Sequence, residues 1–163
     1  ENSEGIVIFS HGINSCSYSL LSQQLFFYQN GYDVISYDSS GCNLSSGEQH
    51  SFSQSLNDLY YALDYIDNNE NINNKKKYLF GFSWGGYASA SISALYSKKI
   101  YASVSISGYN NPNNLFNKVV LRYAGLVGLS GCILPSMKYK YKKDNAPLAI
   151  DCINDSKMPL FIL

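Results

Sequence analysis

A serine between two glycines, directly after an apolar run, is the part of this sequence best suited to chemistry. Residues 78–82 (YLFGF) precede Ser83, and residues 84–86 (WGG) follow it. The apolar run is typical of a buried strand, and the small residues after it indicate the start of a helix. Glycines at 81 and 85 permit a tight turn that lifts the serine hydroxyl off the end of the strand. This arrangement predicts a nucleophile for acyl transfer.

A Gly-x-Ser-x-Gly sequence taken alone also occurs by chance in ordinary turns between a strand and a helix. The strand before it and the helix after it favour the nucleophile here, since Ala88, Ile92 and Leu95 recur at helical spacing. The start of a helix also leaves free N–H groups and a dipole that favour a developing negative charge beside Ser83.

Composition limits the classes of protein to which the chain can belong. Its 163 residues, of which 45% are hydrophobic, fit one globular domain. Twelve basic and twelve acidic residues give a net charge of zero, so we expect no nucleic-acid partner. The four cysteines form no Cys-x-x-Cys pair, so we expect free thiols, no metal site and no cofactor.

The sequence also shows no pattern for export or membrane insertion. The first residues do not combine a basic region with a long apolar run, as a signal peptide does. The longest apolar stretch, residues 119–135, contains Arg122 and is too short to span a bilayer. We therefore expect a cytoplasmic protein that makes at most transient contact with a membrane.

Short apolar runs alternate with segments of helical periodicity along the chain. Leu21, Leu25 and Tyr28 recur at helical spacing before Gly31, and a second helix is expected over residues 52–66. Strands separated by helices predict a parallel sheet with both faces covered, whose ligands bind at the carboxyl ends of the strands. Five strands are expected, near residues 6–10, 34–38, 78–82, 102–107 and 159–163.

The alternation stops over residues 109–155. An insertion of this length between two sheet strands is typical of a cap over an active site. We therefore expect residues 1–108 to form the N-terminal part of the core, 109–155 a cap on the Ser83 side, and 156–163 the return to the core.

The expected cap contains an apolar portion and a basic run. The apolar portion packs on the body, forms the wall of an acyl pocket, or does both. The residues expected to face such a pocket are Val119, Leu121, Leu126 and Leu129. The basic run at 138–143 is better interpreted as a solvated surface than as a site for an anionic head group.

Three other segments occur where an acyl-transfer enzyme needs them. Residues 10–14 (SHGIN) follow the first strand, residues 37–48 (YDSSGCNLSSGE) follow the second, and Ser107-Gly108 ends the fourth. With the serine turn, they resemble the α/β-hydrolase superfamily, in its branch of serine-aminopeptidase-like, monoglyceride-lipase-like and lysophospholipase-like proteins. The motifs stand in the order and spacing of that family, and the resemblance covers essentially the whole chain.

The resemblance implies a fold. It is the α/β-hydrolase three-layer sandwich, with a mainly parallel sheet, helices on both faces and a cap insertion. The five strands would then lie in the spatial order second, first, third, fourth, fifth.

The resemblance also implies roles for individual residues. Ser83 matches the nucleophile, and the backbone N–H groups of Ile13 and Trp84 match the donors of an oxyanion hole. The chain departs from the family at Asn43, where glycine is usual, and at Ser40, where many members have arginine. The residues that match a structural loop motif are Asp38, Gly41, Ser45 and Gly47.

A serine nucleophile needs a base to take its proton and an acid to orient that base. The two histidines, His11 and His50, both precede the serine turn, whereas in the family the acid and the histidine follow the last strand expected here. We therefore expect the native protein to continue past Leu163 with both groups, and the 163-residue chain alone not to turn over substrate. His11, next to a glycine at a strand end, is expected to be structural.

These observations favour a serine hydrolase that cleaves carboxylic esters of lipid-like or small acyl substrates through an acyl-enzyme, of the lysophospholipase or monoacylglycerol-lipase type. An acyl-protein thioesterase or an aminopeptidase would use the same machinery. A non-catalytic protein with the hydrolase fold is the alternative of another class, and the intact serine turn is the evidence against it.

Overall fold

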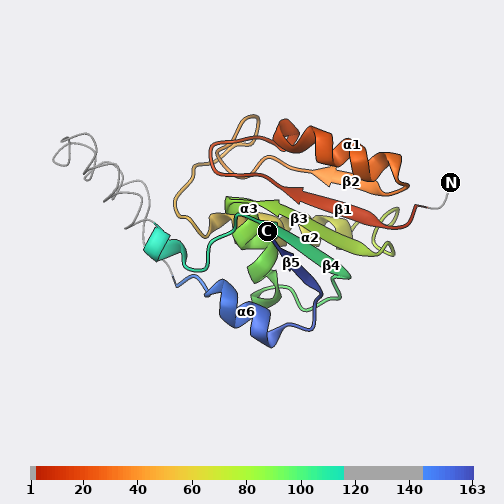
Figure 1. Cartoon of the computed structure of the whole chain (residues 1–163). Coiled ribbons are helices and arrows are strands. Elements are labelled where there is room, and N and C mark those ends of the chain that lie inside the picture. The colour runs from red at the N-terminus through yellow and green to blue at the C-terminus, as the bar shows by residue number, and fades with distance from the viewer. Residues whose placement is uncertain (1–2, 116–144) are drawn as a thin grey trace.

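A five-stranded parallel sheet forms the centre of the computed structural model, which describes residues 3–115 and 145–163 (Figure 1). The spatial order is β2-β1-β3-β4-β5, and each neighbouring pair is parallel. The five expected strands and their order are therefore confirmed. The strands are β1 (Ile6–Ser10), β2 (Asp33–Ser36), β3 (Lys77–Phe82), β4 (Ala102–Ile106) and β5 (Leu160–Ile162).

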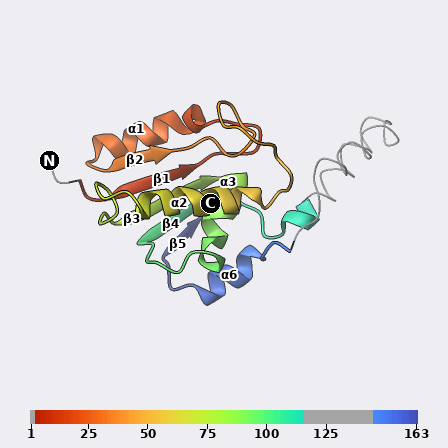
Figure 2. The same cartoon turned by 180° about the vertical axis from the view of Figure 1, so that it is seen from behind.

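Helices cover both faces of the sheet, as expected for an α/β-hydrolase (Figures 1 and 2). The 3₁₀ turn η1 (Ser17–Leu20) and α1 (Leu21–Gln29) lie on one face, over β1 and β2. The helices on the other face are α2 (Gln54–Asp67), α3 (Trp84–Ser91) with its 3₁₀ extension η2 (Ile92–Ala94), and α6 (Ala149–Asp155). No helix among residues 3–115 and 145–163 has the length and apolar character needed to cross a membrane.

Strand β1 is buried on both of its faces. Ile6 and Ile8 join the core cluster formed with α2 and α3, whereas Val7 and Phe9 join the cluster on the α1 side. Because successive strand residues point to opposite faces, these four apolar residues pack against the helices on both faces of the sheet.

The face of α1 that packs on the sheet differs from the expected one. Leu21, Leu25 and Tyr28 are exposed to 51%, 47% and 68%, so the periodicity pointed to the wrong face. Leu20 and Phe27 pack in the core instead. The helix contains no charged residue, so apolar residues occur on several sides and their spacing did not distinguish the buried side.

Helix α6 lies within the range expected to form a cap. It packs against α3 and η2, and its residues Ala149 and Cys152 are buried. The division of the chain into core and cap stays a prediction. The four residues expected to face an acyl pocket, Val119, Leu121, Leu126 and Leu129, lie outside the described residues, so that expectation stays a prediction.

Asn110 holds the two ends of the intervening segment together. Its carbonyl accepts the N–H of Ala149 at 2.9 Å, and its side-chain oxygen accepts the N–H of Ile150 at 2.9 Å. These bonds satisfy N–H groups in the first turn of α6, which lack partners within the helix. Residues that are about 40 positions apart in the sequence are therefore joined directly by hydrogen bonds.

The described cysteines agree with the expectation of free thiols. Cys16, Cys42 and Cys152 are all unbridged, whereas Cys132 lies outside the described residues. Burial raises the pKa of the Cys42 and Cys152 thiols, which keeps them protonated and unreactive.

The ion pair of Asp67 and Lys77 predicts a specific loss of stability at acid pH. The two side chains are 8% and 9% exposed and 2.9 Å apart. Burial opposes ionisation of Asp67, but hydrogen bonds from Lys77, Lys98 and Tyr96 lower its pKa. Asp67→Asn should cost about 3 kcal/mol of unfolding free energy at pH 7, because Lys77 is left buried without its counter-charge.

The effect should depend on pH in one direction. A lowered pKa gives stability that is present above the unfolded-state pKa, about 3.9, and is lost as pH falls through the folded-state pKa. Urea unfolding of both proteins from about pH 7 down to about pH 3 should therefore show the difference shrinking only at the acid end. A difference that stays constant over this range would rule out the ionised carboxylate as its source.

Candidate active site

Ser83 occupies the turn between β3 and α3 in a strained conformation. Its φ of 54° and ψ of −107° lie in a region that non-glycine residues rarely adopt. The Ser83 N–H donates to the carbonyl of Ile106 at 2.8 Å, and the Ser83 carbonyl accepts the N–H of Tyr87 at 3.1 Å. The strained backbone expected for this serine is therefore present, fixed between the end of β4 and the first turn of α3.

The two glycines flanking Ser83 let three backbone segments touch. A Cβ atom on Gly81 would lie 2.1 Å from the carbonyl oxygen of Gly85, and one on Gly85 would lie 2.1 Å from the carbonyl oxygen of Ser10. The N–H of Gly85 also donates to the carbonyl of His11 at 3.1 Å. The turn is thus locked against the end of β1, and no larger side chain fits at either position.

Ile13 lies on the loop that follows β1, beside Ser83. A Cβ atom on the preceding Gly12 would be only 3.7 Å from the Ser83 Cβ. Trp84 is the first residue of α3, so its N–H has no acceptor within the helix. In the described part of the chain, neither this N–H nor that of Ile13 donates a hydrogen bond. Both remain available to an anion.

A cavity of about 430 Å³ adjoins Ser83. Its lining comes from the loop after β1, from η1 and α1, and from the ends of β3 and β4. None of these described lining residues has a charged side chain. The apolar members are Ile13, Leu20, Phe80, Phe82 and Ile106, and the polar members are Ser15, Ser19, Gln23 and Ser83. Sequence reasoning missed the η1 and α1 residues, because only the folded path of the chain brings them over β3.

His11 has a structural role, as expected. Its side chain is 1% exposed. The Nε2 atom accepts the N–H of Ser39 at 3.0 Å, so Nδ1 carries the ring proton and donates it to the carbonyl of Gly12 at 2.7 Å. Both nitrogens are therefore engaged, and His11 links the loops that follow β1 and β2. His50 is exposed and does not line the cavity beside Ser83.

Asp38 organises the loop after β2, which the resemblance marked as structural. Its carboxylate accepts the N–H of Ser17 at 2.7 Å and the side-chain amide of Asn43 at 2.8 Å. Burial opposes its ionisation, but these hydrogen bonds outweigh burial and lower its pKa. Ser45 closes the loop by donating to the Asp38 carbonyl at 2.6 Å. Asp38 thereby fixes the start of η1, one wall of the cavity.

The departure from the family at Asn43 has a physical explanation. Asn43 has a φ of 45°, in the left-handed region that glycine and asparagine tolerate best. Its amide also donates to Asp38. Asparagine thus suits this left-handed conformation and adds a hydrogen bond to Asp38.

Substitutions at Asn43 should separate these two effects. Asn43→Gly keeps the backbone freedom and loses the bond, whereas Asn43→Ala loses both. We expect Asn43→Ala to be less stable than Asn43→Gly by about 1 kcal/mol, measured by thermal or urea unfolding. Equal stability of the two variants would show that the positive φ carries no cost here.

Among residues 3–115 and 145–163, no cluster of three or more His, Cys, Asp or Glu side chains is placed to hold a metal ion.

Solved α/β-hydrolases and esterases share this fold. An esterase of Pyrococcus furiosus superposes with a TM-score of 0.74 at 20% identity, covering 99% of this chain and 61% of its own. Est1E of Butyrivibrio proteoclasticus, solved with ferulic acid, gives 0.60 at 20% identity, covering 74% and 49%. The α/β hydrolase GrgF of a Penicillium species gives 0.59 at 22% identity, covering 75% and 44%.

The chain spans between 44% and 61% of the length of these three proteins. A comparison with curated proteins gives no significant match. The model of one protein family, described as serine aminopeptidase S33, matches residues 1–153. With the sheet order and the strained serine turn, this match shows that the chain belongs to the serine aminopeptidase S33 family of the α/β-hydrolase superfamily.

Proposed function

We propose that the protein is a serine hydrolase that cleaves carboxylic esters through an acyl-enzyme, with Ser83 as the nucleophile. One observation carries the proposal: Ser83 stands in a strained turn at the wall of a cavity whose described lining residues are all uncharged. Strain of this kind persists where the surrounding structure fixes a residue for function.

The proposed reaction begins with attack of the Ser83 hydroxyl oxygen on the ester carbonyl carbon. The carbonyl oxygen then becomes an oxyanion, which the N–H groups of Ile13 and Trp84 stabilise. Collapse of this intermediate breaks the bond to the alcohol, which leaves with the proton taken from Ser83, and an ester remains between Ser83 and the acyl group. Water attacks that ester in turn and releases the acid.

The proton of Ser83 needs a base. His11 is excluded from this role by its two hydrogen bonds, and His50 does not line the cavity. The activity is therefore proposed for the whole protein, in which residues 1–163 supply the nucleophile and the oxyanion donors.

The lining of the cavity supports an ester of a lipid-like or small acyl group. Leu20, Phe80 and Phe82 offer apolar contact to the acyl part. Ser15, Ser19 and Gln23 offer hydrogen bonds to the alcohol part. A substrate of the lysophospholipase or monoacylglycerol-lipase type has both parts, which is why we propose this type.

An aminopeptidase is the second candidate, because the matched family bears that name. Its substrate presents an ammonium group, which calls for a carboxylate in the pocket. None of the described residues that line the cavity is acidic. This favours the ester over the peptide. An acyl-protein thioesterase would share the machinery of Ser83, and a hydrolase-fold protein without activity would keep the pocket alone.

A panel of chromogenic substrates tests the proposal. The whole protein should hydrolyse p-nitrophenyl acetate, butyrate and octanoate, and should leave amino-acid p-nitroanilides uncleaved. An octanoyl thioester shows whether sulfur is accepted as the leaving atom. Preference for the p-nitroanilides would identify a peptidase, and absence of turnover on every member would favour a non-catalytic protein.

A further inference from the structure

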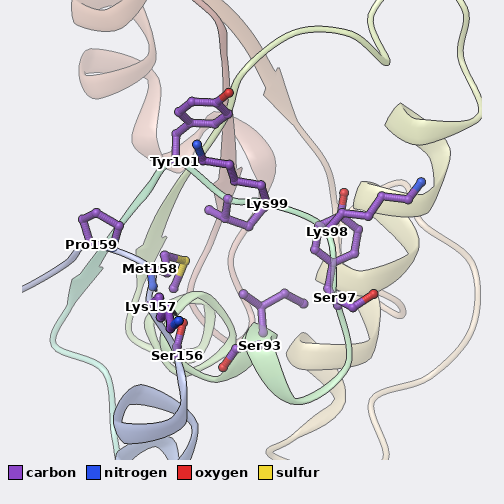
Figure 3. Close-up of a pocket in the computed structure, with 12 residues that line it drawn as sticks. Ser93, Ser97, Lys98, Lys99, Tyr101, Ser156, Lys157, Met158 and Pro159 are labelled. Atoms are coloured by element: carbon purple, nitrogen blue, oxygen red, sulfur yellow. Dashed lines mark hydrogen bonds between the residues drawn. The ribbon is translucent and has the colours of Figure 1, made fainter.

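A second cavity, of about 650 Å³, lies at the amino ends of β4 and β5 (Figure 3). Its lining comes from η2 and from two loops, residues 96–101 before β4 and residues 156–159 before β5. Ser83 follows the carboxyl end of β3, and all neighbouring strands are parallel. The cavity therefore lies at the edge of the sheet opposite the candidate active site and is independent of it.

Every charged side chain that lines this cavity is positive. Lys98, Lys99 and Lys157 belong to the lining, and none of the other described residues that line it is an aspartate or a glutamate. Figure 3 shows Lys99 beside Tyr101 on one wall, and Lys157 on the loop that leads into β5. The whole sequence has a net charge of zero, so this local excess of positive charge is a property of the site and not of the protein.

Neighbouring carboxylates do not neutralise this charge. Asp67 pairs with Lys98 at 2.9 Å, but it also pairs with Lys77 and accepts the Tyr96 hydroxyl. One carboxylate is thus shared between two ammonium groups. Within the described residues, Lys99 and Lys157 have no ion-pair partner, and Lys99 lies over the ring of Tyr101, 4.2 Å from its centroid.

The inner surface of the cavity is apolar. Ile92 and Ile100 are 1% and 7% exposed, and Met158 and Pro159 complete this surface. Serine hydroxyls at 93 and 97 lie among the lysines in the lining. A volume of about 650 Å³ is in the range of small-molecule sites. A fitting ligand combines an anionic group with an apolar body.

We propose that this cavity binds an organic phosphate monoester. The ammonium groups of Lys99 and Lys157 attract the phosphate, since they act as point charges well suited to it, and the hydroxyl of Ser97 donates a further hydrogen bond. The apolar or aryl group of the ester packs against Ile92, Ile100 and Met158. Nothing in this arrangement requires Ser83, so the site adds a binding function to the proposed hydrolase.

Phenyl phosphate is a suitable probe, measured by isothermal titration calorimetry. The whole protein should bind it more tightly than inorganic phosphate, which lacks the ring, and more tightly than phenol, which lacks the charge. The double variant Lys99→Gln, Lys157→Gln should bind it about tenfold or more weakly. Both side chains are exposed, so the variant should fold normally, as circular dichroism would show. Should it not fold, Lys157→Gln alone replaces it, with a smaller loss expected.

Lys76→Gln is the matched control. Lys76 also approaches the Tyr101 ring, at 5.7 Å, but it does not line the cavity, so its loss should change the affinity less than about twofold. No measurable binding of phenyl phosphate, or unchanged binding by the folded double variant, would overturn the proposal. Inorganic phosphate binding as tightly as phenyl phosphate would also overturn it, because the apolar surface would then have no part in binding.

Discussion

Replacing Ser83 by alanine is expected to abolish covalent labelling by a fluorophosphonate probe and to lower ester hydrolysis by about four orders of magnitude or more. The expectation follows from the position of the hydroxyl at the cavity wall, at the start of α3. Without the oxygen no acyl-enzyme forms. Labelling is measured on the whole protein by in-gel fluorescence, and hydrolysis by release of p-nitrophenol from p-nitrophenyl butyrate.

Ser107 provides a matched control for this experiment. It also has a positive φ, of 51°, directly after a strand, but it is exposed and does not line the cavity. Ser107→Ala should keep both labelling and hydrolysis. Labelling that survives Ser83→Ala would place the nucleophile elsewhere. Loss in both variants would point to a fault in folding and not in chemistry.

The second large effect is expected at Gly85. A Cβ atom there would lie 2.1 Å from the carbonyl oxygen of Ser10 and 2.6 Å from the Ser10 Cβ. Since backbone cannot move aside as a flexible side chain can, Gly85→Ala must push α3 away from β1. We expect a loss of about 3 kcal/mol or more of unfolding free energy, which corresponds to a fall in Tm of about 10 °C for a chain of this length.

Gly12→Ala tests whether this loss is specific to Gly85. A Cβ on Gly12 would meet its nearest neighbour, an atom of the Phe82 ring, at 3.5 Å, which is ordinary van der Waals contact. Its stability should stay within about 0.5 kcal/mol of the parent, as measured by differential scanning calorimetry. If Gly85→Ala also stayed within about 0.5 kcal/mol of the parent, the close approach of α3 to β1 described above would be contradicted.

The sequence predicts the sheet well because each strand carries its own signal. The strand expected at 78–82 is observed over Lys77–Phe82, and the strand expected at 102–107 is observed over Ala102–Ile106. The turn at Ser83 could be predicted for the same reason, since its glycines and its serine are neighbours in the chain. The spatial order of the strands came from the family resemblance and not from the periodicity.

What the sequence did not predict depends on segments that meet only after folding. Leu21 and Leu25 occur at the right spacing for a buried face, yet Leu20 is buried and Phe27 is the α1 residue that packs against the same core cluster. The cavity at Lys99 and Lys157 joins two loops almost 60 residues apart in sequence. The sequence predicted a structural role for His11, but it did not show that Ser39 would be its partner.

The hydrogen bonds that Ala149 and Ile150 donate to Asn110 affect which changes of sequence the fold can accept. The body itself therefore holds together the residues on either side of the segment that the structure does not describe. Replacing that segment by one of another length should cost little additional closure entropy. The sheet and the serine turn should then keep their geometry.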